Sequence, residues 1–449
     1  MQQSVSRVVC LAVLCAVLPA ASVAQRRPAV IAPQELAKIW DAEHVSPPLP
    51  PLVDHAEVVK RLTAFVAATP DLFSMEKIGE SGEGRAINYV RVGSGPTSVL
   101  LWSQMHGDEP TATSALFDVF EYFRRHRHDA VAQRILSKLT LHVVPMLNPD
   151  GAERFQRRNA QSIDINRDAL RLQTTEGQLL KALRDRVAPR VGFNLHNQSW
   201  RTSVGNPPKP ASISLLSVAY DEKRSENAGR KLTKKLCAVV RDALEPFASG
   251  QIGRYDDEFE VRAFGDNLTL WGTPVVLIET GPWASETPDP PLVRLNFIAI
   301  VSALDALATG AVNRAKPKRY EELPMNETKL LYVAVRNATV ISGSGIKPFT
   351  ADIGISGTRR VRSQDGRREV AISTSVEDLG DLRTLGALRE IDATGMIAAP
   401  DRDYREGALV DLPDWRRKGE TSIAVGQPAR IALLKPAQDG KYRVELILK

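Results

Sequence analysis

Cysteine is scarce in this chain of 449 residues, which has three in all. Two of them, Cys10 and Cys15, lie in an N-terminal stretch that is predicted to be cleaved, which would leave Cys237 alone. Because a single thiol cannot form an internal disulfide, we expect the mature protein to be held by its core and by any metal that it binds. Cys237 lies at helical spacing among apolar residues, which favours a buried structural cysteine.

The chain also has few strong charge or hydrophobic runs. Its net charge of +6 is spread along the sequence, and no dense basic tract predicts binding to nucleic acid. Beyond the N-terminal segment we identify no apolar run long enough to span a bilayer, so we expect no stable membrane insertion. The apolar and charged fractions, 43% and 25%, are typical of a globular protein, and the length predicts two domains.

Residues 1–24 are typical of a signal peptide. Arg7 supplies a positive charge, residues 8–18 form an apolar stretch too short to cross a bilayer, and Ser-Val-Ala precedes Gln25. A lipoprotein site at Cys15 is an alternative, although Leu14 is bulkier than such sites usually tolerate. We therefore expect a secreted or periplasmic protein.

Three regions follow this segment. Residues 25–54 are rich in proline and predict an extended lead-in. Residues 55–315 alternate helical and apolar strand patterns, which predicts an α/β domain with a mixed, mostly parallel sheet and helices on both faces. Short β-patterned runs broken by Gly, Asp and Pro predict a mostly-β accessory domain over residues 325–449. The expected helices of the α/β domain are 56–67, 111–124, 175–187, 223–247 and 292–307, and its expected strands are 86–92, 97–105, 139–146, 191–195 and 275–279.

Two of the seven histidines stand in similar settings. His106 and Glu109 follow a predicted strand in Met-His-Gly-Asp-Glu-Pro, and His196 ends another in Phe-Asn-Leu-His-Asn-Gln. An α/β sheet brings such side chains together at the carboxyl ends of its strands. Two imidazoles and one carboxylate are the ligands of a catalytic zinc that leaves a fourth position for water. We predict one Zn²⁺ per chain at these residues, although another divalent metal would also suit these donors.

Several short motifs surround these residues in a fixed order. They are Gly-Glu-Ser-Gly-Glu-Gly-Arg-Ala-Ile at 79–87, His-Gly-Asp-Glu at 106–109, Asn-Pro-Asp-Gly at 148–151, Arg-Arg-Asn at 157–159 with Asp-Ile-Asn-Arg at 164–167, Asn-Leu-His at 194–196 and Leu-Ile-Glu-Thr-Gly at 277–281. Together they resemble the zinc carboxypeptidase family, the carboxypeptidase A/B-like metallopeptidases, over roughly residues 55–307. The resemblance implies a zinc-carboxypeptidase-like fold and hydrolysis of C-terminal peptide bonds.

The resemblance also implies catalytic roles for two side chains. Glu279, at the end of an apolar strand, matches the family's catalytic glutamate, and burial there is expected to raise its pKa toward neutrality, which suits proton transfer. Arg157 matches the arginine that stabilises the oxyanion. Arg158 is the alternative, and we expect only one of these adjacent side chains to face the site.

Further residues match positions that bind substrate in the family. Asn166 and Arg167 match the pair that binds a free C-terminal carboxylate, which a guanidinium can hold in bidentate fashion. Asp168 stands where many relatives have asparagine and is a candidate to neutralise part of the charge of Arg167. Tyr255 matches a mobile tyrosine near the leaving group. The acidic residues 256–258 would favour basic substrates if they line the entrance.

The C-terminal region has a fainter resemblance, carried by residues 330–345, 351–355 and 391–400, to the small β domain of metal-dependent amidohydrolases. No histidine occurs beyond His196, so we expect an accessory domain without chemistry of its own.

Three functions are compatible with these observations. The leading interpretation is a secreted zinc metallocarboxypeptidase whose substrates are peptides with a free C-terminal carboxylate. The alternative is a zinc-dependent amidase or deacylase that acts on cell-wall peptides or acylated amino acids. A binding protein with a degenerate enzyme fold is disfavoured because every required residue is present. The preferred C-terminal residue and the oligomeric state are left open.

Overall fold

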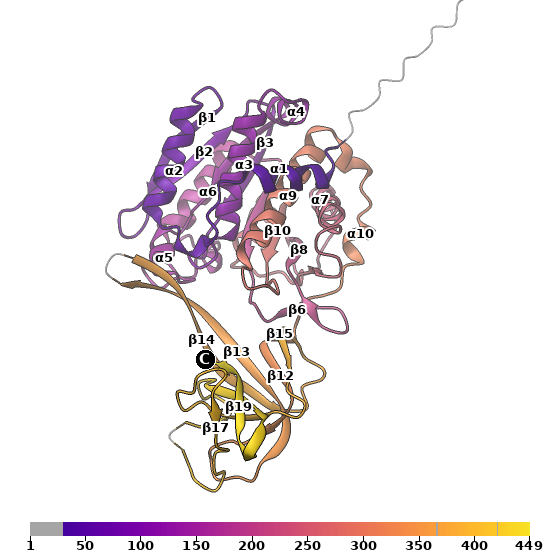
Figure 1. The fold of residues 1–449 in the computed structure, drawn as a ribbon. Helices are drawn as coiled ribbons and strands as arrows, with labels where there is room; N and C mark the ends of the chain where they lie inside the picture. Colours follow the sequence, from indigo (N-terminus) through magenta and orange to yellow (C-terminus); the bar gives the residue numbers. More distant parts are fainter. Residues whose placement is uncertain (1–29, 365–366, 420) are drawn as a thin grey trace, which may run out of the picture.

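The computed structural model describes residues 30–364, 367–419 and 421–449 of the chain. The predicted signal peptide lies outside these residues. Within them, an α/β part is followed along the chain by a β part, drawn below it in orange and yellow in Figure 1.

The α/β part is built on an eight-stranded sheet with the order β1-β2-β4-β3-β5-β10-β8-β9. Strands β4, β3, β5 and β10 run parallel to one another, whereas β2 and β8 flank them in the antiparallel direction. The prediction of a mixed, mostly parallel sheet is therefore confirmed. The strands are β1 (Phe73–Glu80), β2 (Ala86–Val92), β3 (Thr97–Ser103), β4 (Leu139–Val144), β5 (Val191–Asn197), β8 (Ile213–Ser217), β9 (Ile252–Arg254) and β10 (Val275–Thr280).

Helices bury apolar side chains against both faces of this sheet. One core contains residues of α3, α7 and α9, and a second contains Leu180 and Leu183 of α6 and Phe264 and Leu268 of α8. Each face is therefore shielded from water by its own layer of helices, as expected for strands that are apolar on both sides. The helices are α1 (Pro33–Glu43), α2 (His55–Ala68), α3 (Thr111–His126), α4 (Ala130–Lys138), α5 (Pro149–Arg154), α6 (Thr175–Val187), α7 (Ala228–Leu244), α8 (Phe264–Leu270), α9 (Asp289–Ala308) and α10 (Lys318–Glu321).

Two segments differ from the sequence-based expectation. The Pro-rich lead-in is not simply extended, because it contains α1, which buries Leu36 and Trp40 in the core. The indole of Trp40 donates a 2.7 Å hydrogen bond to the carboxylate of Asp118 in α3.

Helix α9 is long and apolar enough to cross a membrane, although we expected no such run. Its most apolar window is 78% buried inside the protein, because α9 packs among the other core helices.

The β part contains a second eight-stranded sheet, in the order β14-β13-β12-β16-β18-β19-β17 with β15 paired to β12. Two of its strands, β13 and β14, are far longer than the short runs that we expected, and Figure 1 shows their hairpin reaching toward α5. The strands are β12 (Leu330–Val340), β13 (Phe349–Gln364), β14 (Arg367–Gly380), β15 (Gly386–Asp392), β16 (Ile397–Pro400), β17 (Leu409–Val410), β18 (Ile431–Pro436) and β19 (Tyr442–Leu448). A small sheet of β6 (Thr202–Val204), β7 (Lys209–Pro210) and β11 (Glu327–Thr328) lies where the chain passes from one part to the other.

The hairpin of β13 and β14 contacts the α/β part through charged side chains. Arg359 makes a two-armed ion pair with Asp289, the first residue of α9, at 2.8 and 2.5 Å. Arg368 donates to the carbonyl oxygen of Ala152 in α5 at 3.1 Å. The predicted domain boundaries at 315 and 325 remain predictions.

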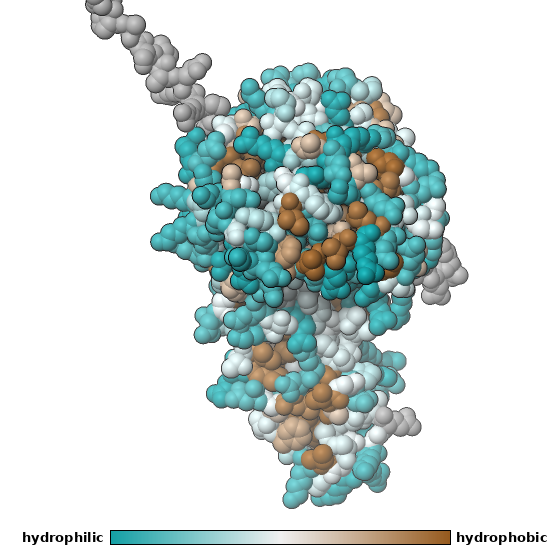
Figure 2. Space-filling view, turned by 180° about the vertical axis from the view of Figure 1, so that it is seen from behind, coloured by the Kyte–Doolittle hydropathy of each residue, from teal (hydrophilic) through white to brown (hydrophobic). Residues whose placement is uncertain are grey.

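Figure 2 shows hydrophobic side chains in separate brown areas on a mostly hydrophilic surface.

Candidate active site

Neighbouring parallel strands bring the predicted site residues to one edge of the sheet. His196 lies near the carboxyl end of β5, and its register partner on β10 is Glu279. On the other side of β5, Leu195 pairs with Ser103, the last residue of β3, and the loop that follows carries His106 and Glu109. Residues from separate motifs are therefore adjacent because their strands are adjacent.

The loop after β3 is held in place by the Asn-Pro-Asp-Gly turn. A Cβ atom on Gly107 would lie 2.0 Å from the carbonyl carbon of Gly151, so only glycine fits at this crossing. The side chain of Asn148 donates to the carbonyl of Met105 at 3.2 Å and to that of Arg157 at 3.3 Å. One asparagine thus connects the loop that carries His106 with the loop that carries Arg157.

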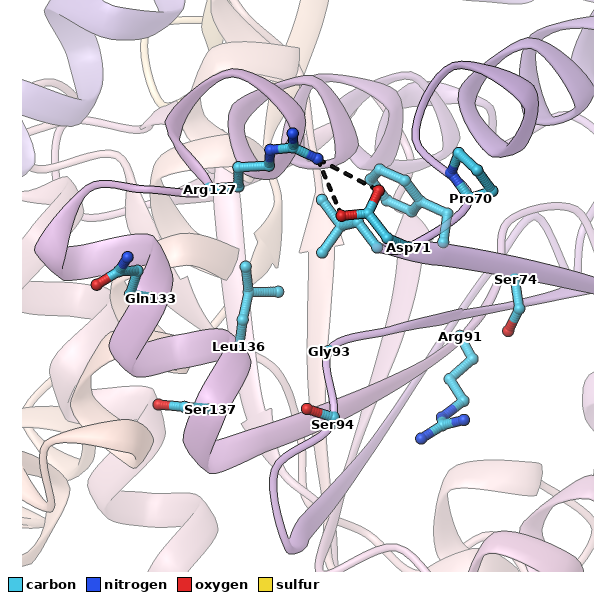
Figure 3. A pocket seen from close by; sticks show the side chains of 12 residues that line it. Pro70, Asp71, Ser74, Arg91, Gly93, Ser94, Arg127, Gln133, Leu136 and Ser137 are labelled. Carbon is cyan, nitrogen blue, oxygen red and sulfur yellow. Dashed lines mark hydrogen bonds and ion pairs between the residues drawn. The ribbon is translucent and has the colours of Figure 1, made fainter.

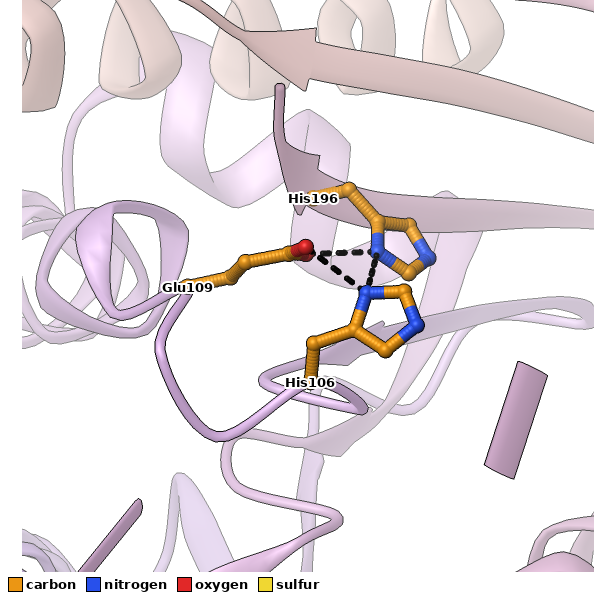
Figure 4. Close-up of side chains that lie close together, drawn as sticks. All are labelled: His106, Glu109 and His196. Atoms are coloured by element: carbon orange, nitrogen blue, oxygen red, sulfur yellow. Dashed lines mark hydrogen bonds and ion pairs between the residues drawn. The ribbon is translucent and has the colours of Figure 1, made fainter. Parts of the chain in front are cut away.

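His106, Glu109 and His196 point their ligand atoms at one another (Figure 4). Nδ1 of His106 lies 2.7 Å from one carboxylate oxygen of Glu109, and Nδ1 of His196 lies 2.7 Å from the other. The two nitrogens are 3.1 Å apart. All three side chains are buried, and their ligand atoms lie within 4.8 Å of one another. The structure therefore brings together the three predicted metal ligands.

The electrostatics of these residues fit a bound cation. Although burial opposes ionisation, the two imidazoles lower the pKa of the Glu109 carboxyl. Burial alone would lower the pKa of His106, but Glu109 and Asp164 raise it to about 9. Burial lowers the pKa of His196 in spite of Glu109. A charged carboxylate between two imidazole nitrogens in a buried site is the donor set of zinc, and these residues fit one zinc ion.

Asp164, which the sequence presents only as part of the Asp-Ile-Asn-Arg motif, also supports the site. One of its carboxylate oxygens lies 3.2 Å from Nε2 of His106, and the other accepts from Nε of Arg157 at 2.9 Å. Although burial raises it, these two partners hold the pKa of Asp164 well below its usual range. A carboxylate on the far nitrogen of a metal-binding histidine fixes the orientation of the ring. A histidine partner of this kind could have been sought among the acidic residues of the motifs.

Of the two candidate arginines, Arg157 faces the site. Its Nη1 lies 3.1 Å from Nδ1 of His106 and 3.6 Å from the Glu109 carboxylate. Arg158 instead donates to the carbonyl of Ser162 at 3.0 Å. The two adjacent arginines therefore have different partners, and only one of them faces the site, as we expected.

Glu279 and Tyr255 complete this group. Burial, followed by the charge of Glu109, raises the pKa of Glu279. Its Oε2 atom is buried without a hydrogen-bond partner among the described residues, so it is available to water or substrate. Tyr255 is partly exposed, and burial followed by the charge of Glu279 raises its pKa, which Arg157 opposes.

The predicted carboxylate-binding pair lies on the short helical turn Ile165–Arg167. The side-chain oxygen of Asn166 accepts from the backbone N–H of Phe264 at 2.9 Å, which leaves its NH₂ group as the donor for a ligand. Arg167 has a carboxylate partner, but this is Glu260, whose Oε2 lies 3.3 Å from Nε of Arg167. The suggestion that Asp168 neutralises Arg167 is wrong, since its buried carboxylate accepts from Thr174 at the start of α6.

The acidic run after Tyr255 does not form a free negative entrance. Asp257 pairs with Arg230 and with Arg224, the latter at 3.4 Å. Asp256 lies 3.7 Å from the same Arg224. These arginines neutralise most of the run, which weakens the expectation of a preference for basic substrates.

A pocket of about 580 Å³ lies elsewhere in the α/β part (Figure 3). Gly93 and Ser94, between the end of β2 and the start of β3, line it together with Leu136, just before β4. This is the amino-terminal edge of the parallel strands, opposite the edge that carries His106. Its ion pair of Asp71 and Arg127 offers no metal-ligand set, so we place the site at the three converging ligands.

Fold and site together define a zinc metalloprotein of the α/β class. Residues 58–231 of the chain match the family described as Zinc carboxypeptidase. The family resemblance drawn from the motifs is thereby confirmed.

Individual relatives match shorter parts of the chain. Carboxypeptidase 2 of Trichophyton tonsurans is 26% identical over 172 residues, which are 35% of this chain and 31% of the relative. Carboxypeptidase SOL1 of Arabidopsis thaliana is 27% identical over 119 residues, 25% of this chain and 24% of the relative. The chain thus spans about a third or less of the length of these curated relatives. The crystal structure of carboxypeptidase A from Helicoverpa armigera is 14% identical, with a TM-score of 0.45 over 62% of this chain and 80% of that chain.

The resemblance of the C-terminal region to amidohydrolases is not supported by these comparisons. The match to the family ends at residue 231, well before the β part begins. The residues after 330 do form a β-rich sheet, as expected.

Proposed function

We propose that this protein is a secreted zinc metallocarboxypeptidase that hydrolyses the last peptide bond of substrates with a free C-terminal carboxylate. The observation that carries the proposal is the register of β5 and β10. It places Glu279 beside His196, while His196, His106 and Glu109 converge on one point. A base next to a metal site is the minimum that hydrolysis of a peptide bond by water requires.

The side chains around this point divide the chemical work. A zinc ion bound there would activate a water molecule and polarise the scissile carbonyl. The carboxylate of Glu279 takes a proton from water and passes it to the leaving amine, a role that suits its raised pKa. Arg157, held by Asp164, donates to the oxygen on which negative charge develops.

The residues near the turn at 165–167 account for selectivity toward chain ends. The guanidinium of Arg167 and the NH₂ group of Asn166 bind the terminal carboxylate of the substrate, which an internal peptide bond lacks. The Tyr255 hydroxyl donates to the substrate near the scissile bond. Secretion rests on the signal peptide expected at residues 1–24, and N-terminal sequencing of exported protein should begin at Gln25.

Zinc content and turnover of blocked dipeptides test this function together. We expect one zinc per chain in the wild type and in Glu279→Gln, with turnover reduced about 10²- to 10⁴-fold in the variant because the base is lost. Glu109→Gln should lose both the turnover and the bound zinc. Glu286→Gln, an exposed glutamate seven residues beyond Glu279, is the matched control and should behave like the wild type.

Different substrates separate this function from its alternative. Turnover of cell-wall peptides or acylated amino acids without turnover of ordinary peptides would favour the zinc-dependent amidase or deacylase. Full activity of Glu279→Gln on every substrate would refute the role of Glu279 in either case.

A further inference from the structure

Arg167 already has a carboxylate partner within the fold. Glu260 lies 3.3 Å from it, and both side chains are accessible to a ligand, with 34% of Glu260 and 37% of Arg167 exposed. The backbone of Glu260 is anchored, since its N–H donates to the buried Asp266 at 3.0 Å. The Glu260 carboxylate is thus held next to the guanidinium that a substrate carboxylate would need.

Glu260 is bound more firmly on its other side. Arg262 donates to its carboxylate three times, from the backbone N–H at 3.1 Å, from Nε at 3.2 Å and from Nη2 at 3.1 Å. Arg262, followed by Arg167, lowers the pKa of Glu260, which therefore carries a full negative charge at neutral pH. Because its 3.3 Å contact with Arg167 is longer than its three contacts with Arg262, Glu260 can leave Arg167 and remain ionised and paired with Arg262.

We propose that Glu260 is a positioning residue that competes with the substrate's terminal carboxylate for Arg167. This inference rests on the proposed function, in which Arg167 binds that carboxylate. A peptide acid displaces Glu260, which stays with Arg262, whereas a peptide amide brings no negative charge and leaves the internal pair intact. Glu260 therefore weakens the binding of acids without affecting the binding of amides.

Equilibrium binding tests the proposal without turnover. The probes are N-acetylphenylalanine and its amide, titrated into the full-length, zinc-loaded Glu279→Gln protein. Exposed ion pairs are weak, so adding Glu260→Gln should lower the Kd of the acid by about two- to five-fold and leave the Kd of the amide unchanged. Arg262→Gln should raise the Kd of the acid, because Glu260 then has Arg167 as its only cation.

Two control variants each remove a charge of the same sign as Glu260 or Arg262 but leave the contacts between Glu260, Arg262 and Arg167 intact. Glu258→Gln removes a negative charge two residues from Glu260, and Arg171→Gln removes an exposed positive charge. In the double variant of Glu260→Gln and Arg262→Gln, the effect of removing Arg262 should disappear, because the competing carboxylate is gone.

Each outcome decides the matter. If the Kd of the acid changes equally in Glu260→Gln and Glu258→Gln, or changes in neither, the proposal is overturned. In that case, tighter binding of the acid than of the amide by the parent protein would still support the role of Arg167. Equal affinity of the parent protein for acid and amide would refute that role, and the inference with it. Opposite shifts in the variants of Glu260 and Arg262, confined to the acid, are the expected result.

Discussion

Replacing Arg359 by methionine should loosen the hairpin of β13 and β14 from the α/β part. The Arg359 side chain is 31% exposed, and its guanidinium donates to both carboxylate oxygens of Asp289, whose side chain is only 4% exposed. Methionine keeps most of the length and volume of the arginine stem but removes the charge. The buried Asp289 carboxylate would then lack its cation.

The size of the effect follows from this geometry. Removing one partner of a fully buried pair costs about 3–5 kcal/mol. The cost here should be smaller because Arg359 is partly exposed and because Asp289 begins α9, where the helix dipole stabilises a negative charge by about 0.3–1 kcal/mol. We therefore expect the free energy of unfolding to fall by about 2 kcal/mol.

Urea unfolding of a double-mutant cycle measures this. Because Asp289→Asn removes the unpaired charge, the cost of Arg359→Met should be at least about 1 kcal/mol smaller in that background. Arg383→Met is the matched control, since the pair of Arg383 with Asp381 is exposed and should contribute nothing measurable. Identical urea midpoints for Arg359→Met and Arg383→Met would refute the reasoning.

Two further predictions concern the α/β part. Gly107→Ala should destabilise the protein by about 1–3 kcal/mol and reduce zinc binding, because the new methyl group meets the backbone of Gly151 at 2.0 Å. Gly265→Ala, whose Cβ has 3.6 Å of space, should be tolerated, and equal thermal stability of the two variants would contradict the close approach. Burial, followed by Arg91 and Arg186, lowers the pKa of His142 to about 4. Because the folded state favours its neutral form, up to about 3 kcal/mol of stability is present above pH 6.5 and is lost as the pH falls toward 4. His142→Gln should flatten the pH dependence of urea unfolding in that range, and an unchanged slope would refute the role of His142.

Much of the α/β part could be predicted because its signals are local. The strand that begins at Val191 and the helix that ends at Val187 can be predicted from apolar periodicity over a few residues. The metal ligands could be predicted for a related reason, since each follows or ends a strand whose neighbours in the sheet are parallel.

Other features could not be read from local patterns. The proline content of residues 25–54 predicted extended chain, but burial of Leu36 and Trp40 stabilises α1. The runs around 349–380 predicted short strands, but pairing with each other extends β13 and β14 well beyond the apolar pattern. In both cases a partner far along the chain overrides local composition.

The sequence by itself determined the resemblance to zinc carboxypeptidases, the donor set of the metal site and the layered α/β architecture. These depend on residue type and short spacing, which place side chains on a strand or at its end wherever the strand lies. Only the tertiary structure decided that Arg157 faces the ligands, that Asp164 orients His106 and that Glu260 pairs with Arg167. These contacts lie in loops whose sequences have no periodicity. The conformation of such a loop depends on what it packs against, and here it is set by long-range hydrogen bonds such as that from the Phe264 N–H to Asn166.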